Sequence, residues 1–131
     1  EIMANSDNVL RGGLTVKHID VGELMKHIKF EATVPQVLRG SGPGIEKIFK
    51  TPAHDFELGE IVLNDAKSAA LTAKTAEVIF IYNGSVEAND GKARFTLKSG
   101  EAMLATAGAK FGLKTDENTV IFKATVPDAE R

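Results

Sequence analysis

The sequence contains no cysteine and only three histidines, His18, His27 and His54. The lack of cysteine excludes disulfide bonds, thiolate nucleophiles and thiolate metal sites. A zinc or iron site would need several converging histidine or carboxylate ligands, and no two histidines form an H-x-H pair. We therefore expect this chain to hold no metal site by itself.

The sequence also lacks an excess of charge of one sign and a long hydrophobic run. The 16 Lys and Arg residues nearly balance the 18 Asp and Glu residues, which leaves a net charge of -2. A basic face for nucleic acid or an anionic membrane is thus not expected. No apolar run approaches the length of about 18 residues that a membrane-spanning helix needs, and no signal peptide is recognisable. We expect a cytoplasmic location, with neither a nucleic-acid nor a membrane partner.

What is present is typical of one folded domain. The 131 residues are 43% hydrophobic and 26% charged, too apolar for a disordered chain. A chain of this length buries roughly two-thirds of its unfolded surface, enough for one core. The chain begins with Glu1-Ile2-Met3, inside an apolar-polar pattern, and we interpret it as a processed product or a piece of a longer protein.

A short helix is predicted near the N-terminus. Asp20 can cap it, with Glu23 as the capping-box partner three residues later. Gly22 in the first turn makes the helix less stable by about 1 kcal/mol than alanine would, and so weakens the prediction. Four apolar residues share one helical face: Val21, Leu24, Met25 and Ile28.

The remainder of the chain predicts strands. Val34–Leu38 is apolar, and two short apolar pieces flank Gly59. Val78–Tyr82 is the strongest strand, and Asn83-Gly84 after it predicts a two-residue hairpin turn. A second turn is expected at Asn89–Gly91. Strands about every ten residues, separated by Gly and Asn turns, indicate a mainly β fold, an antiparallel barrel or jelly-roll sandwich with one short N-terminal helix.

Arg11 is the first candidate for chemistry. It follows Val9-Leu10 and precedes two glycines, so we expect its guanidinium to be partly enclosed, with backbone close enough to admit a ligand. The planar fork of donors suits a phosphate or an enediolate oxygen. Asp7 could orient that fork, and Lys17 adds a second cation. A purely structural Asp-Arg pair is the alternative that the spacing leaves open.

The run from Met3 to Thr15, followed by Lys17 to Val21, closely resembles the A-x-S-D-N-V-x-R-x-G-x-T-x-K signature of type I mannose-6-phosphate isomerases. The helix and the strands beyond it also resemble the C-terminal portion of that family. The family comprises zinc-dependent enzymes built from cupin barrels with a helical insertion, which interconvert mannose 6-phosphate and fructose 6-phosphate. The resemblance implies that residues 1–30 are the tail of the catalytic cupin and residues 31–131 a C-terminal cupin-like β-domain.

The resemblance also implies roles for four residues. Arg11 matches the active-site arginine beside the reacting carbons of the sugar phosphate, and Asp7 falls in the same strict motif. Lys17 matches a lysine at the edge of the substrate pocket, a candidate for contacting the phosphate. Glu1 matches an acidic residue near the substrate, a candidate proton carrier. The implied chemistry is proton transfer between adjacent sugar carbons through a cis-enediol, with Arg11 stabilising the developing oxyanion.

Two departures from the family pattern are Val16 and Gly22, where the family usually has proline. The family's zinc ligands, a glutamine, two histidines and a glutamate, lie upstream of the motif, before Glu1. The resemblance thus implies that zinc acts in the complete enzyme through ligands outside this chain, and that the N-terminal catalytic part is a partner. The alternative is a non-enzymatic β-sandwich module that binds a sugar or docks on another protein.

Overall fold

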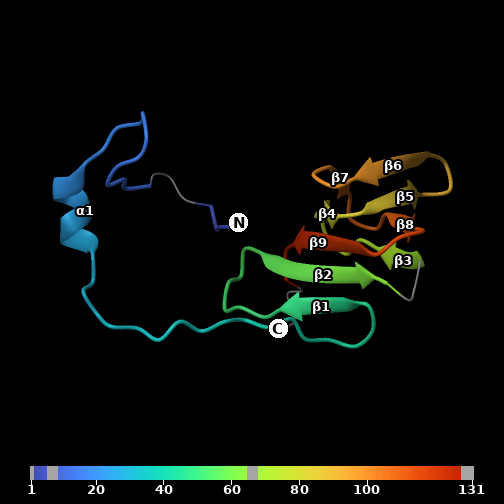
Figure 1. The fold of residues 1–131 in the computed structure, drawn as a ribbon, viewed down its shortest axis with the longest axis horizontal. Coiled ribbons are helices and arrows are strands. Elements are labelled where there is room, and N and C mark those ends of the chain that lie inside the picture. The colour runs from blue at the N-terminus through green and yellow to red at the C-terminus, as the bar shows by residue number, and fades with distance from the viewer. Residues whose placement is uncertain (1, 6–8, 65–67, 128–131) are drawn as a thin grey trace. The chain divides into compact units, whose positions relative to one another are not determined.

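The computed structural model describes residues 2–5, 9–64 and 68–127. The described residues form one helix, α1 (Val21–His27), and nine strands (Figure 1). The strands are β1 (Glu46–Phe49), β2 (Glu57–Leu63), β3 (Ser68–Thr72), β4 (Glu77–Asn83), β5 (Ser85–Asn89), β6 (Arg94–Lys98), β7 (Ala102–Ala105), β8 (Lys110–Lys114) and β9 (Thr119–Thr125). Two compact units make up the chain, residues 5–37 and residues 38–131 with 1–4.

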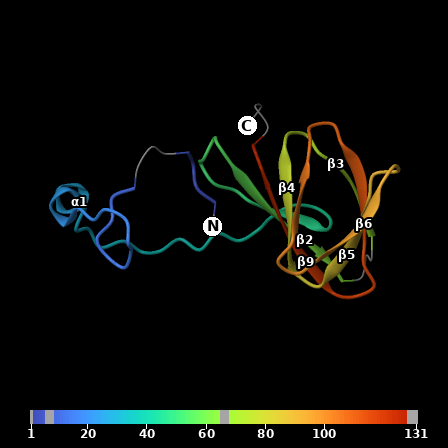
Figure 2. The same cartoon turned by 90° about the horizontal axis from the view of Figure 1, so that it is seen from above.

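The strands form two antiparallel sheets. The five-stranded sheet has the order β1-β2-β9-β4-β7, and the four-stranded sheet has the order β3-β8-β5-β6. Figure 2 shows the two sheets as facing layers, with β2, β4 and β9 in one layer and β3, β5 and β6 in the other. No strand pairing within the described ranges joins the two sheets. The predicted mainly β fold is therefore confirmed, as a jelly-roll sandwich and not as a closed barrel.

The core lies between the two sheets. Ile61, Ile79 and Ile121 are fully buried and occupy adjacent strands of the five-stranded sheet. Val86 and Leu113 are buried on the four-stranded sheet. Because successive side chains of a strand point to opposite faces, every second residue enters this core.

The predicted hairpin at Asn83-Gly84 is wrong. β4 pairs with β7 and β9, whereas β5 pairs with β6 and β8, so the chain passes from one sheet to the other at Gly84. Gly84 has φ +86°, and its backbone lies against the start of β9: a Cβ there would be 2.5 Å from Thr119 Oγ1. Local turn chemistry predicts a reversal of direction, but not which sheet the next strand joins.

The second predicted turn is confirmed, because β5 and β6 form an antiparallel pair whose last register partners are Asn89 and Arg94. Between them, Asp90 Oδ1 accepts hydrogen bonds from the backbone N–H of Ala93 at 2.7 Å and of Lys92 at 2.9 Å. These two bonds lower the pKa of Asp90. The short side chain thus stabilises the turn by satisfying backbone donors.

Replacing Gly84 by alanine is expected to destabilise the sandwich more than replacing Gly91. Both glycines have φ +86°, but nothing lies within 4 Å of a Cβ at Gly91. Backbone strain is therefore common to the two variants, and the contact with Thr119 adds about 1–3 kcal/mol in Gly84→Ala alone. Urea unfolding of both variants measures the difference. Equal losses of stability would show that the close approach at Gly84 is unimportant.

Two other expectations need correction. The apolar pieces on either side of Gly59 are one strand, β2, because Gly59 is buried against Glu46 and Ile48 of β1 and leaves room for continuous pairing. Val34–Leu38 forms no strand, since it finds no pairing partner among the described residues. No helix in the described part of the chain has the length and apolar character needed to cross a membrane.

Candidate functional site

The arginine segment, defined here as residues 9–28, ends in the predicted helix. Asp20 caps α1 as expected, because its Oδ1 accepts a 2.8 Å hydrogen bond from the backbone N–H of Glu23. Glu23 does not complete the predicted capping box: its carboxylate instead contacts Lys26 Nζ at 2.7 Å and His27 Nε2 at 3.0 Å. The hydrogen bond from Lys26, and then that from His27, lowers the pKa of Glu23.

Arg11 as a whole residue is half-buried, and the hydrogen bond of its guanidinium is exposed. Its Nη1 donates a 3.0 Å hydrogen bond to the carbonyl oxygen of Val9, which fixes one side of the guanidinium. Among the described residues, this is the hydrogen bond that the Arg11 side chain forms. The other N–H groups of the guanidinium can therefore donate to a ligand. The arrangement suits binding of a phosphate or carboxylate, or of an oxygen that gains negative charge.

Of the other predicted site residues, the structure describes Lys17. Lys17 is exposed, and its backbone N–H donates a 3.2 Å hydrogen bond to Thr15 Oγ1. No hydrogen bond joins Arg11 to Lys17 within the ranges that the structure describes. Glu1 and Asp7 lie outside the described residues.

The apolar side chains of the arginine segment are largely exposed. No residue of α1 is buried. Met25, on the predicted apolar face of the helix, is 50% exposed, and Leu14 and Val16 in the preceding loop are fully exposed. Exposed apolar groups at this density are typical of a segment that is covered by a partner.

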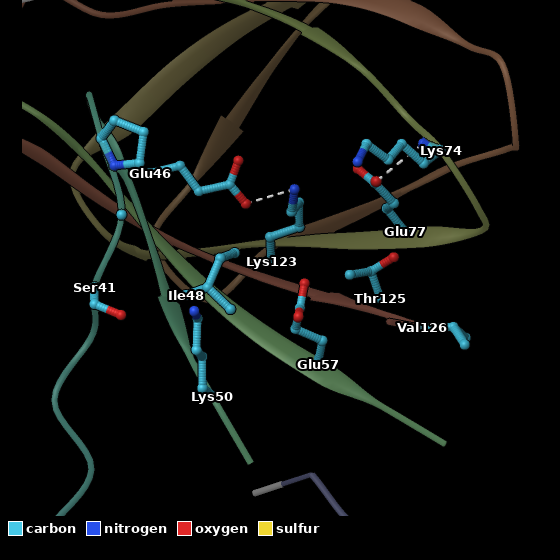
Figure 3. A pocket seen from close by; sticks show the side chains of 12 residues that line it. Ser41, Glu46, Ile48, Lys50, Glu57, Lys74, Glu77, Lys123, Thr125 and Val126 are labelled. Atoms are coloured by element: carbon cyan, nitrogen blue, oxygen red, sulfur yellow. Dashed lines mark hydrogen bonds and ion pairs between the residues drawn. The ribbon is translucent and has the colours of Figure 1, made fainter. Parts of the chain in front are cut away.

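A second candidate site is a cavity of about 330 Å³ on the sandwich itself. Figure 3 shows that its side chains come from β1, β2, β4 and β9 and from the loops next to them. Six of the lining residues described by the structure carry charge, three carboxylates and three ammonium groups: Glu46, Glu57, Glu77, Lys50, Lys74 and Lys123.

Three of the charged groups of this cavity are well buried, whereas Lys50 and Lys74 are exposed. Glu77 is only 3% exposed, and its Oε1 accepts a 3.2 Å hydrogen bond from the backbone N–H of Lys74. The side chain of Lys123 is 13% exposed and that of Glu46 is 26% exposed. Lys123 Nζ lies 2.5 Å from Glu46 Oε1, and the two side chains point toward one another (Figure 3).

The cavity is not among the features predicted above, although the sequence carries a signal for it. Glu77, Ile79 and Ile81 alternate along β4, so the glutamate occupies an inward position that a sandwich core normally fills with an apolar residue. On β9, Lys123 likewise lies two residues from the buried Ile121 and on the same face of the sheet. A charged residue two positions from buried aliphatic residues of the same strand therefore predicts a polar region inside the sandwich.

The residues present do not fit a zinc ion. Over the described ranges, no three His, Asp or Glu side chains are grouped closely enough to hold a metal. In the cavity the carboxylates are interleaved with ammonium groups, whose positive charge opposes a bound cation. The imidazole of His27 contacts Glu23 on the surface of α1, away from any such group of ligands.

Comparison with known proteins gives consistent matches. No model of a known protein family matches the chain. Mannose-6-phosphate isomerase of Escherichia coli is 38% identical over 109 residues, which are 82% of this chain and 28% of that enzyme. Mannose-6-phosphate isomerase 1 of Arabidopsis thaliana is 24% identical over 96% of this chain and 30% of its own length.

Solved structures agree with the sequence matches. The crystal structure of mannose 6-phosphate isomerase from Salmonella typhimurium, bound to its substrate and to zinc, superimposes with a TM-score of 0.76 and 28% identity. That match covers 96% of this chain and 32% of the Salmonella chain. The EutQ protein of Clostridium difficile matches with a TM-score of 0.55 at 15% identity, and shows likeness of fold alone.

The chain spans less than a third of the length of the two curated isomerases named above. The resemblance expected from the arginine motif is confirmed by both kinds of comparison. This chain is homologous to a segment of the mannose-6-phosphate isomerases, and it has the mainly β fold of that segment.

Proposed function

We propose that this chain is the C-terminal part of a zinc-dependent aldose-ketose isomerase that interconverts mannose 6-phosphate and fructose 6-phosphate. The observation that carries the proposal is the structural match, over 96% of the chain, to a Salmonella isomerase crystallised with substrate and zinc. The residues that the structure describes do not fit zinc, so the proposal assigns the metal to the part of the enzyme outside this chain. The cytoplasm is the location proposed with this activity.

The proposed division of labour has residues 1–30 as the tail of the catalytic cupin and residues 31–131 as the C-terminal cupin-like β-domain. The division of the structure after residue 37 supports a boundary in this region. The exposed apolar side chains of the arginine segment support it as well, because a piece of a larger core leaves such groups uncovered.

In the proposed reaction, Arg11 acts on the oxygen that becomes negatively charged when a proton leaves the adjacent sugar carbon. Its guanidinium is held at one side by Val9, which leaves further donors for that oxygen. Asp7 is proposed to orient Arg11, Lys17 to contact the phosphate, and Glu1 to carry the proton. Proton return to the neighbouring carbon of the cis-enediol completes the exchange of aldose and ketose.

The isolated chain is expected to show no isomerisation of mannose 6-phosphate and no tight zinc binding. Activity should return when a separately produced N-terminal part of the enzyme is added, because that part supplies the metal ligands. A coupled assay of fructose 6-phosphate formation, with each part alone as control, measures both results. Zinc-dependent turnover by this chain alone at the rate of a complete isomerase would contradict the proposal.

A non-enzymatic β-sandwich module that binds a sugar or docks on a protein is the alternative. A self-sufficient module should present no large apolar patch to solvent. The outer face of β4 and β7 carries one, since Val78, Tyr82 and Leu104 are 43%, 62% and 66% exposed, and Val78 pairs with Leu104. This patch favours a chain that packs against further parts of its own enzyme.

A further inference from the structure

The inner face of the five-stranded sheet changes from apolar to charged along its strands. In β9, Ile121 is fully buried in the core, whereas Lys123 lines the cavity. In β4, Ile79 is fully buried, whereas Glu77 lines the cavity. Inward positions of a strand lie two residues apart, so these charged side chains continue the rows of the core. The cavity is therefore a polar end of the sandwich interior.

Stability does not account for these charges. A buried ion pair is often no more stable than an apolar pair of the same volume. Glu46 Oε1 is buried and forms no hydrogen bond, because its close contact with Lys123 lacks hydrogen-bond alignment. Among the described residues, the hydrogen bond recorded for Glu77 Oε1 is a long one of 3.2 Å, donated by the backbone N–H of Lys74. Glu77 thus retains acceptor capacity beside the cavity, whereas Glu46 Oε1 is enclosed against Lys123.

We propose that this cavity binds an uncharged polyhydroxylated ligand of about the size of a hexose. Carboxylates only accept hydrogen bonds and ammonium groups only donate them, whereas a hydroxyl group does both. Neighbouring hydroxyls can therefore bridge Glu77 and Lys123. The three carboxylates and three ammonium groups cancel in charge, which gives no net attraction for an anion. The volume of about 330 Å³ is that of a small-molecule pocket.

Titration of the whole chain with D-glucose tests this inference without requiring isomerase activity. We expect saturable binding with a Kd in the millimolar range, and changes in backbone amide NMR shifts centred on Glu57, Glu77 and Lys123. Glucose 6-phosphate, the charged counterpart, should bind these residues no more strongly, because the balanced charges of the cavity give its phosphate no net attraction. The proposal is independent of the proposed isomerase function, since this assay detects no turnover.

Two variants locate the site. Glu77→Gln should weaken D-glucose binding by at least about tenfold, because a charged acceptor is lost. Glu60→Gln is the matched control: Glu60 lies on β2, and its register partner is the outward Phe122, so binding should be unchanged. If Glu77→Gln does not fold, Glu57→Gln takes its place. The inference is overturned by no binding of D-glucose, by equal losses in variant and control, or by stronger binding of glucose 6-phosphate at the same amides.

Discussion

Replacing Arg11 by alanine is expected to lower the turnover of the complete isomerase by at least about a hundredfold. The guanidinium is held at one side by its hydrogen bond to Val9, and its other donors can stabilise a developing oxyanion. Because this charge develops mainly in the transition state, kcat should fall far more than KM rises. Steady-state kinetics with mannose 6-phosphate measures both constants.

The matched control for this prediction is Arg39→Ala. Arg39 is exposed and lies beyond the arginine segment, so its loss should leave kcat within about twofold. Circular dichroism should show the same fold in both variants, because Arg11 contacts only neighbouring backbone within the described residues. Near-normal turnover in Arg11→Ala would remove Arg11 from the proposed chemistry, and equal losses in both variants would indicate a general effect of charge.

Replacing Ile121 by alanine is expected to lower the free energy of unfolding of the sandwich by about 2–5 kcal/mol. Ile121 is 0% exposed, and it pairs with Ile61 on β2 and with Ile81 on β4. Removing its side chain leaves a cavity at the centre of the five-stranded sheet, because neighbours on two strands cannot close it without shifting. Urea unfolding of the isolated chain measures the loss.

Leu104→Ala is the control on the same sheet. Leu104 lies on β7 and is 66% exposed, so its truncation should change the free energy of unfolding by no more than about 0.5 kcal/mol. Comparison of Leu104→Ala with Ile121→Ala separates the effect of losing a buried side chain from the effect of losing any aliphatic side chain. A loss in Leu104→Ala as large as that in Ile121→Ala would mean that the patch on β4 and β7 is covered in solution.

Much of the local structure could be predicted because it depends on neighbouring residues. The helix begins where Asp20 can accept from the Glu23 N–H, and the turn at Asn89–Gly91 forms where Asp90 can accept from the backbone that follows it. The family resemblance likewise rests on a contiguous motif around Arg11. Each of these features is encoded within a few residues of sequence.

Other features depend on residues far apart in the chain. Asn83-Gly84 has the composition of a hairpin turn, yet Gly84 leads to the other sheet because its backbone packs against Thr119. The short pieces around Gly59 join into one strand because β9 pairs along all of it and β1 packs against that glycine on the other side. Strand pairing is non-local, and alternation in one strand specifies its faces but not its partner.

Short-range patterns and a contiguous motif carry the mainly β class, the capped helix and the family resemblance, and they single out Arg11 as a candidate. The partners of each strand, and the meeting of Glu46, Glu77 and Lys123 from three strands in one cavity, follow from the three-dimensional fold. The physical reason is that charges separated by tens of residues meet only when non-local pairing aligns the inward positions of their strands.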